Sequence, residues 1–362
     1  MKRNPLRKEL LDFRRKLRTS GDDLETLRAL SETYLESGRF ADAVVVLQQL
    51  LARRPGDVDA MIACGGCYRE LGLYESAATE FEHAARSAPR CAAARYNLGW
   101  VYDLMGRADE AIEQHMRAIE LDGGDAEGYY RLGVTFARRG EFEEAETWYR
   151  RAIEADYDCA KAHTNLGYAL DRMGRTDEAI LEFKRAIEIG PEHAERHLNL
   201  GAIYGEKGMF DDAIAEFRRA VEIDPRSAEA HFNLGTALLR RDAVDEALDE
   251  LEMAVRYDAD NPMAHCELGL VLSRKGMFRR AIAEFQRVVT LDGETPEICY
   301  QIGIALAALD RLDDAERYLE SAVESDPDDP RFHYQLGIVR DRLGHDIEAV
   351  DAYRRAGRLV KR

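Results

Sequence analysis

The chain has 362 residues, of which 46% are hydrophobic and 33% are charged, a composition typical of a folded protein and not of a disordered one. Its formal net charge of −18 argues against nucleic-acid binding, which requires a basic surface, and leaves proteins as the expected partners. No run of 18 or more apolar residues occurs, so we expect no membrane-spanning helix.

The N-terminal segment, residues 1–23, is charged throughout and lacks the apolar stretch of a secretory signal. Within it, Leu10, Phe13 and Leu17 fall on one face of a helix expected over residues 5–18. We interpret the segment as a basic helix that caps the N-terminal end of the fold. The alternative, a helix lying on a membrane surface, remains open because basic residues flank the apolar side.

From residue 24 to residue 362, the sequence repeats every 34 residues without insertions. One glycine recurs at this spacing, usually after a leucine, at Gly65, Gly99, Gly133, Gly167, Gly201, Gly235, Gly269, Gly303 and Gly337. An alanine recurs at Ala43, Ala77, Ala111, Ala145, Ala179, Ala213, Ala247, Ala281, Ala315 and Ala349. We therefore divide the chain into ten units, 24–57, 58–91, 92–125, 126–159, 160–193, 194–227, 228–261, 262–295, 296–329 and 330–362.

Each unit has the apolar periodicity of two amphipathic helices. In the third unit they run from about Ala92 to Met105 and from about Asp109 to Asp122. A residue that tolerates a left-handed backbone is expected in the turn between them. These turn residues are Gly106, Gly140, Gly174, Gly208, Gly276 and Gly344, with Asp242 and Asp310 in two units.

The pattern resembles the tetratricopeptide repeat, whose unit carries W-x2-L-G-x2-Y followed by alanine, an aromatic residue, alanine and proline. The sixth unit matches it at Leu200, Gly201, Tyr204, Gly208, Ala213, Phe217, Ala220 and Pro225. The resemblance implies an all-α fold, a solenoid in which tandem helix-turn-helix repeats form a right-handed superhelix. In place of the family's tryptophan, this chain has His163, His197, His231, His265 and His333, with Tyr129 and Met61 in other units.

The stretch Cys64-Gly65-Gly66-Cys67 has the spacing of a metal-binding or redox pair. In register with the repeats, however, both cysteines occupy small apolar positions of the helix-packing core, and we favour that interpretation. The histidines of successive repeats are separated by at least a helix diameter, too far to share one zinc ion. We therefore expect no metal and no cofactor. The six cysteines form no disulfide framework, which favours a cytoplasmic protein.

The resemblance implies that first-helix side chains face a concave groove that binds an extended peptide segment of a partner. A row of asparagines two residues before the repeat glycine can pair with a peptide backbone. Aromatic and arginine side chains would add anchors and receive acidic groups. The predicted groove residues are Tyr96, Asn97, Trp100, Tyr130, Arg131, Arg138, Asn165, Tyr168, Arg172, Asn199 and Asn233. The alternative for the asparagines and arginines is that they are solvated residues without a ligand.

We expect a non-enzymatic adaptor, because the repeats leave no residues for a catalytic domain and no phosphate loop or nucleophile elbow occurs. Two alternatives remain. The chain can be a scaffold that self-associates through its C-terminal edge, where Gly357 replaces the usual Ile or Val and Val350 and Tyr353 remain apolar. It can also be the substrate-recruiting region of a larger protein or complex.

Overall fold

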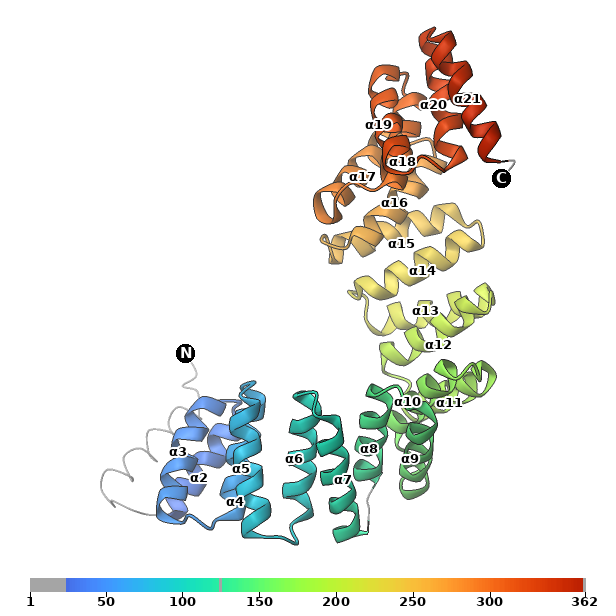
Figure 1. The fold of residues 1–362 in the computed structure, drawn as a ribbon. Coiled ribbons are helices and arrows are strands. Elements are labelled where there is room, and N and C mark those ends of the chain that lie inside the picture. Colours follow the sequence, from blue (N-terminus) through green and yellow to red (C-terminus); the bar gives the residue numbers. More distant parts are fainter. Residues whose placement is uncertain (1–23, 124–125, 361–362) are drawn as a thin grey trace, which may run out of the picture. The chain divides into compact units, whose positions relative to one another are not determined.

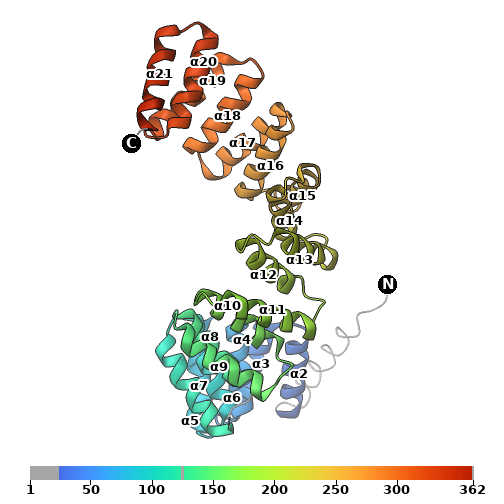
Figure 2. The ribbon, with the colours of Figure 1, turned by 90° about the vertical axis from the view of Figure 1, so that its right-hand side faces the viewer.

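The computed structural model describes residues 24–123 and 126–360, and the helix expected over residues 5–18 lies outside them. The described part of the chain contains twenty α-helices and no strand (Figure 1). The fold is an α-solenoid, as predicted. It divides after Ile189 into two compact units, and the described residues of each unit form five helix hairpins (Figures 1 and 2).

The helices of the first unit are α2 (Leu24–Glu36), α3 (Phe40–Arg53), α4 (Val58–Glu70), α5 (Tyr74–Ser87), α6 (Ala92–Leu104), α7 (Ala108–Asp122), α8 (Ala126–Arg138), α9 (Phe142–Ala155), α10 (Ala160–Arg172) and α11 (Thr176–Ile189). Those of the second unit are α12 (Ala194–Glu206), α13 (Phe210–Ile223), α14 (Ala228–Arg240), α15 (Val244–Tyr257), α16 (Pro262–Arg274), α17 (Phe278–Asp292), α18 (Pro296–Ala308), α19 (Leu312–Ser325), α20 (Pro330–Leu343) and α21 (Asp346–Leu359).

Within each unit, every helix packs on the next one in the chain, so the hairpins stack side by side (Figure 1). The first helices of successive hairpins also contact one another. In the first unit, α4 contacts α6, α6 contacts α8, and α8 contacts α10. These four helices form a continuous surface, which we call the first-helix face.

The repeat glycine is where the two helices of a hairpin approach most closely. A Cβ atom on Gly201 would lie 2.6 Å from the ring of Phe217, and one on Gly99 would lie 2.7 Å from the ring of His115. The residue 16 positions after each repeat glycine makes this contact, so a larger side chain at the glycine would push the hairpin apart.

The predicted left-handed turn residues are confirmed. Eight turn glycines have φ between 67° and 80°, and Asp242 and Asp310 take the same conformation at 60° and 61°. A residue with a left-handed backbone cannot continue a right-handed helix, so these residues end the first helix at a fixed point and reverse the chain into the second.

Candidate functional site

The centre of the first-helix face is a stack of charged and aromatic groups from three consecutive repeats. The indole of Trp100 on α6 has the guanidinium carbon of Arg69, from α4, 3.7 Å from its ring centroid. The guanidinium carbon of Arg131, from α8, lies 4.0 Å from the same centroid. Cation–π contacts at these distances hold all three side chains in place and cover much of the indole.

The first asparagine of the predicted row belongs to the same network. The Oδ1 of Asn97 accepts a hydrogen bond of 3.1 Å from Arg69, and its Nδ2 donates one of 2.8 Å to the carbonyl of Ala93. Its amide is therefore oriented by neighbouring groups before any ligand arrives.

The next repeat extends the network along the face. Glu127 on α8 forms ion pairs with Arg131 at 2.7 Å and with Lys161 of α10 at 3.2 Å. The ammonium group of Lys161 lies 5.5 Å from the ring centroid of Tyr130, whose hydroxyl accepts a hydrogen bond of 3.1 Å from Nδ2 of Asn165. Burial raises the pKa of the Tyr130 hydroxyl, which therefore stays protonated at neutral pH.

This face is hollowed where α6, α8 and α10 meet. The cavity has a volume of about 270 Å³ and is lined by Trp100, Asp103, Glu127, Tyr130, Arg131, Val134, Arg138 and Lys161. Because three of these side chains are basic and two are acidic, and Glu127 is already paired with two cations, an acidic or amide group is the natural occupant.

The floor of the hollow contains a buried polar cluster that the sequence analysis missed. Asp103 accepts a hydrogen bond of 2.8 Å from Thr135 and lies 3.3 Å from Nε2 of His115, which is completely buried. His115 occupies the position where other repeats have Phe81 or Phe183 against the repeat glycine. Aligning the repeats in the 34-residue register shows a histidine at this position, so the sequence contained the signal for the exception.

The predicted aromatic cluster is less exposed than we expected. Only Tyr168 is strongly exposed, at 43%, and its ring packs edge-on against Phe183 with centroids 5.3 Å apart. Trp100 is half-buried under its two arginines, and Tyr96 is half-buried with its hydroxyl donating to Asp122 at 3.1 Å. Tyr96 and Tyr168 make these contacts within their own repeats, whereas Trp100 is covered by arginines from the two neighbouring repeats.

The remaining predicted residues are distributed over both units. Arg138 and Arg172 lie in the last turns of α8 and α10, where Arg172 has its guanidinium carbon 5.5 Å from the centroid of the Phe142 ring. Asn199 and Asn233 lie half-buried on α12 and α14 of the second unit. Each unit thus carries two of the four asparagines.

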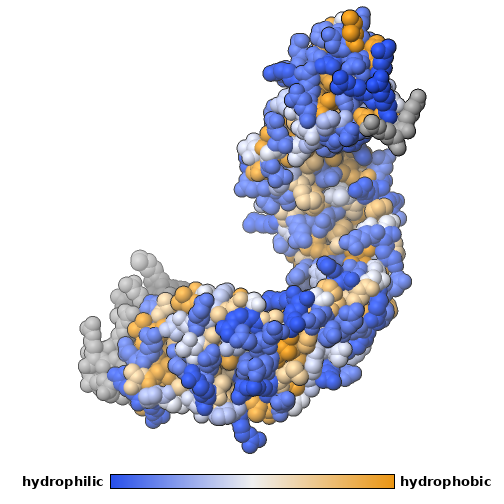
Figure 3. All heavy atoms as spheres, in the orientation of Figure 1, coloured by the Kyte–Doolittle hydropathy of each residue, from blue (hydrophilic) through white to orange (hydrophobic). Residues whose placement is uncertain are grey.

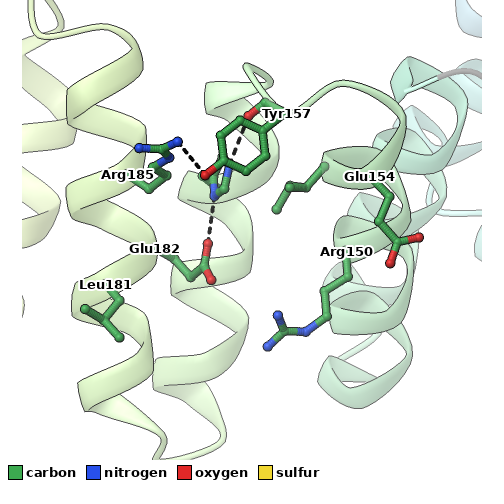
Figure 4. Close-up of a pocket in the computed structure, with 8 residues that line it drawn as sticks. Arg150, Glu154, Tyr157, Leu181, Glu182 and Arg185 are labelled. Atoms are coloured by element: carbon green, nitrogen blue, oxygen red, sulfur yellow. Dashed lines mark hydrogen bonds and ion pairs between the residues drawn. The ribbon is translucent and has the colours of Figure 1, made fainter.

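A second hollow, of about 310 Å³, involves the second helices α9 and α11 (Figure 4). There, Nδ1 of the buried His163 lies 2.7 Å from Glu182, and Nε2 lies 3.3 Å from the carbonyl of Tyr157. A carbonyl oxygen only accepts, so Nε2 is the donor in the contact with Tyr157, and Nδ1 faces the carboxylate of Glu182. The exposed ring of Tyr157 packs edge-on to the imidazole, and Arg185 bonds to its hydroxyl (Figure 4).

The same pair recurs in three more repeats, with Nδ1 to carboxylate distances of 2.6–2.7 Å. These pairs are His197 with Glu216, His231 with Glu250 and His265 with Glu284. These four histidines are therefore buried and hydrogen-bonded, and the sequence analysis did not predict their glutamate partners. The signal was present, because each glutamate follows its histidine by 19 residues.

Cys64 and Cys67 are free and buried in the core of the first unit, as predicted from the register. Burial raises the pKa of the Cys64 thiol to about 12 and that of Cys67 to about 11. Among the described residues, no group of three or more His, Cys, Asp or Glu side chains is arranged to hold a metal ion. No described helix is both long enough and apolar enough to cross a membrane.

Models of the tetratricopeptide repeat match residues 34–98, 92–125, 117–156, 130–194, 198–264 and 272–336. The structure of pilF from Pseudomonas aeruginosa is similar with a TM-score of 0.50 and 20% identity, over 57% of this chain and 94% of that one. YrrB, described as a TPR protein with an unusual peptide-binding site, has a TM-score of 0.41 and 23% identity, over 51% and 95%. MamA has a TM-score of 0.42 and 29% identity, over 46% and 96%. No curated protein matches the chain. With the register, the hairpins and the matched segments in agreement, the chain belongs to the tetratricopeptide repeat family.

Proposed function

We propose that this protein is a non-enzymatic adaptor that binds an extended peptide segment of a partner on the first-helix face of its first unit. Tetratricopeptide repeats generally serve as protein-interaction modules, which supports this class of function. The six free cysteines fit a reducing compartment, and we propose that the protein acts in the cytoplasm.

The observation that carries the proposal is the network through Arg69, Trp100, Arg131 and Lys161 beside the hollow. These side chains come from four consecutive repeats and are already fixed by cation–π contacts and ion pairs. Because their rotamers are set before binding, a ligand loses less entropy when it orders the site.

An extended segment suits this arrangement better than a helix. The amide of Asn165 bonds to the hydroxyl of Tyr130 and also to that of Tyr149, and its oxygen is an acceptor with which a peptide backbone N–H can pair. Neighbouring first helices lie about 10 Å apart. An extended chain advances about 3.3 Å per residue, so one repeat would meet roughly every third residue of the peptide.

The test is a selection of random 16-residue peptides on the immobilised protein, followed by affinity measurement in solution by fluorescence anisotropy. We expect Trp100→Ala to weaken the selected peptides at least about tenfold, because buried aromatic anchors dominate such interfaces. The double variant Asn97→Ala/Asn165→Ala should weaken them as well, since it removes the backbone-pairing amides.

The matched control is Trp148→Ala, which removes the other tryptophan of the chain from the second helix α9. This variant should bind with unchanged affinity. Peptides that bind the wild type and Trp100→Ala equally well would show that the first-helix face is not the binding site, and the proposal would then be wrong.

A further inference from the structure

Helix α21 of the tenth repeat departs from the repeat pattern on its outward side. Ile347 stands where the third, sixth and seventh repeats have Asp109, Asp211 and Asp245. In those repeats the aspartate pairs with a basic residue of the following hairpin, as Asp109 does with Arg139 at 2.6 Å. Ile347 instead exposes 84% of its surface.

Two more departures lie on the same helix or directly after it. Val360 stands where other repeats have a C-cap aspartate such as Asp224 or Asp258, and it is 74% exposed. Gly357 stands where they have Ile or Val. Val350 follows the pattern, but it is 46% exposed, whereas its equivalent Ile214 is buried. Apolar spheres appear among the polar ones over the α20–α21 hairpin (Figure 3).

Ile347, Val350 and Gly357 follow one another along the helix at spacings of three and seven residues and therefore share a face, on which the exposed Arg354 also lies one turn after Val350. Replacing an acidic residue with isoleucine removes the ion pair that a further hairpin of the same type would use. Glycine in place of Ile or Val removes the side chain from the C-terminal part of the face, so another helix can approach closely there. The face therefore suits an interface, but not a contact with an ordinary next repeat.

The charges beside this face identify the occupant. Glu348, Asp351, Arg355 and Arg358 follow one another at spacings of three and four residues along one flank. The flank is acidic in its first half and basic in its second. Antiparallel pairing with an identical helix places Glu348 opposite Arg358 and Asp351 opposite Arg355, whereas parallel pairing places like charges together.

We propose that two copies of this protein associate through α21, which pairs antiparallel with α21 of the second copy across a two-fold axis. The interface is self-complementary, as two-fold symmetry requires, because its centre lies near residue 353 and its two halves have opposite charge. Within one helix, Asp351 and Arg355 already pair at 3.1 Å. In the dimer, Asp351 of each copy pairs with Arg355 of the other copy, in place of the pair within one helix or in addition to it. The first-helix face of the first unit takes no part in the contact.

The size of the surface sets the strength of the dimer. Helix α21 has 14 residues and is therefore about 21 Å long. One such helix pair buries less than the roughly 800 Å² per partner of a standard interface. We therefore expect a reversible dimer with a dissociation constant on the order of 10–100 μM.

Analytical ultracentrifugation of the full chain from about 5 to 500 μM tests the dimer. The wild type should move from monomer toward dimer mass, and Ile347→Asp should raise the dissociation constant at least about tenfold. Aspartate is the residue that other repeats carry at this position, so folding should be unaffected. Leu181→Asp on α11, where the leucine is 65% exposed, is the matched control and should leave the dimer unchanged.

Charge reversal tests the antiparallel arrangement. A chain with Glu348→Arg and Asp351→Arg has an all-basic flank, and a chain with Arg355→Asp and Arg358→Asp has an all-acidic one. Each should be monomeric alone, and an equimolar mixture should form a heterodimer whose formation weakens with salt. A wild type that stays monomeric at 500 μM, or a dimer that Ile347→Asp and the charge reversals leave unchanged, would overturn the proposal.

Discussion

At the residue scale, the structure pairs positions 19 apart, with a chemistry that varies from repeat to repeat. Four repeats use a histidine and a glutamate. Another stacks Tyr129 on Trp148 with ring centroids 6.0 Å apart. A sixth repeat joins Arg95 to Gln114 at 3.1 Å. The two side chains of each pair complement each other. A single substitution therefore leaves the other side chain without its partner at a buried or half-buried position.

We therefore expect Glu250→Gln to destabilise the second unit. A neutral amide makes a weaker hydrogen bond than the carboxylate, which lies 2.6 Å from Nδ1 of the buried His231. The loss should be about 1–2 kcal/mol in guanidinium-induced unfolding. Glu252→Gln on the same helix breaks only an exposed ion pair with Arg280, and its cost should stay below about 0.5 kcal/mol. Equal costs for the two variants would contradict the structural role of the histidine–glutamate pairs.

His115→Phe should raise the melting temperature. The imidazole is fully buried, and its Nδ1 has no hydrogen-bond partner among the described residues. Phenylalanine already fills this position in the repeats of Phe81 and Phe183, and Asp103 keeps its bond to Thr135. Removing the unsatisfied nitrogen should add about 0.5–1 kcal/mol. The comparison variant His231→Phe breaks a paired histidine and should lower the melting temperature.

The thiols of Cys64 and Cys67 should react slowly in the native protein. Their pKa values, raised by burial to about 12 and about 11, keep both protonated at pH 8. Since the folded pKa is raised, the neutral thiols stabilise the fold fully below the ordinary value of 9.0, and this contribution is lost as pH rises toward 11–12. Maleimide labelling followed by mass spectrometry should modify the half-exposed Cys91 and Cys159 first. Fast labelling of Cys64 and Cys67 would contradict the packing interpretation and support a redox role.

At the element scale, the 34-residue register predicted where hairpins begin, where they turn and which side chains pack. It succeeded because periodicity places every residue on a known helix face, as it placed Cys64 in the core. It did not predict the stack on Trp100, because that contact joins three repeats and depends on which side chains happen to be neighbours. It also carried no information on the division after Ile189, since spacing along the chain does not measure compactness.

Asp57 shows how one cap joins two hairpins. Its carboxylate accepts hydrogen bonds from the amide of Ala60 at the start of α4 and from Arg28 of α2 at 2.6 Å. Burial opposes ionisation, but these hydrogen bonds outweigh it and lower the pKa of Asp57. We expect Asp57→Ala to cost about 1–2 kcal/mol at pH 7.

The pH dependence of this cost follows from the lowered pKa. The carboxylate stabilises the folded state fully above the ordinary value of 3.8, and the stabilisation is lost as pH falls through the lower, folded value. Urea unfolding of the wild type and of Asp57→Ala should therefore differ at pH 7 and converge as the pH falls below 3.8. A difference that does not depend on pH would assign the effect to helix propensity instead of the charge.

At the scale of the whole molecule, the chain consists of two five-hairpin units, each with its own first-helix face. Stability in such arrays is local, because a hairpin contacts only its neighbours. Leu166→Ala, which removes a fully buried side chain from α10, should cost about 2–4 kcal/mol. Hydrogen exchange should show the lost protection mainly within residues 24–189, with the strongest effect in α9–α11. A uniform loss over both units would contradict this modularity.

The position of Trp100 between Arg69 and Arg131 gives the protein a built-in optical reporter. The chain has two tryptophans, so Trp148→Phe leaves Trp100 as the sole indole. Its emission depends on the charged groups packed against its ring. Any peptide that displaces an arginine from the indole changes that emission, and association on the first-helix face can then be followed in real time without a label.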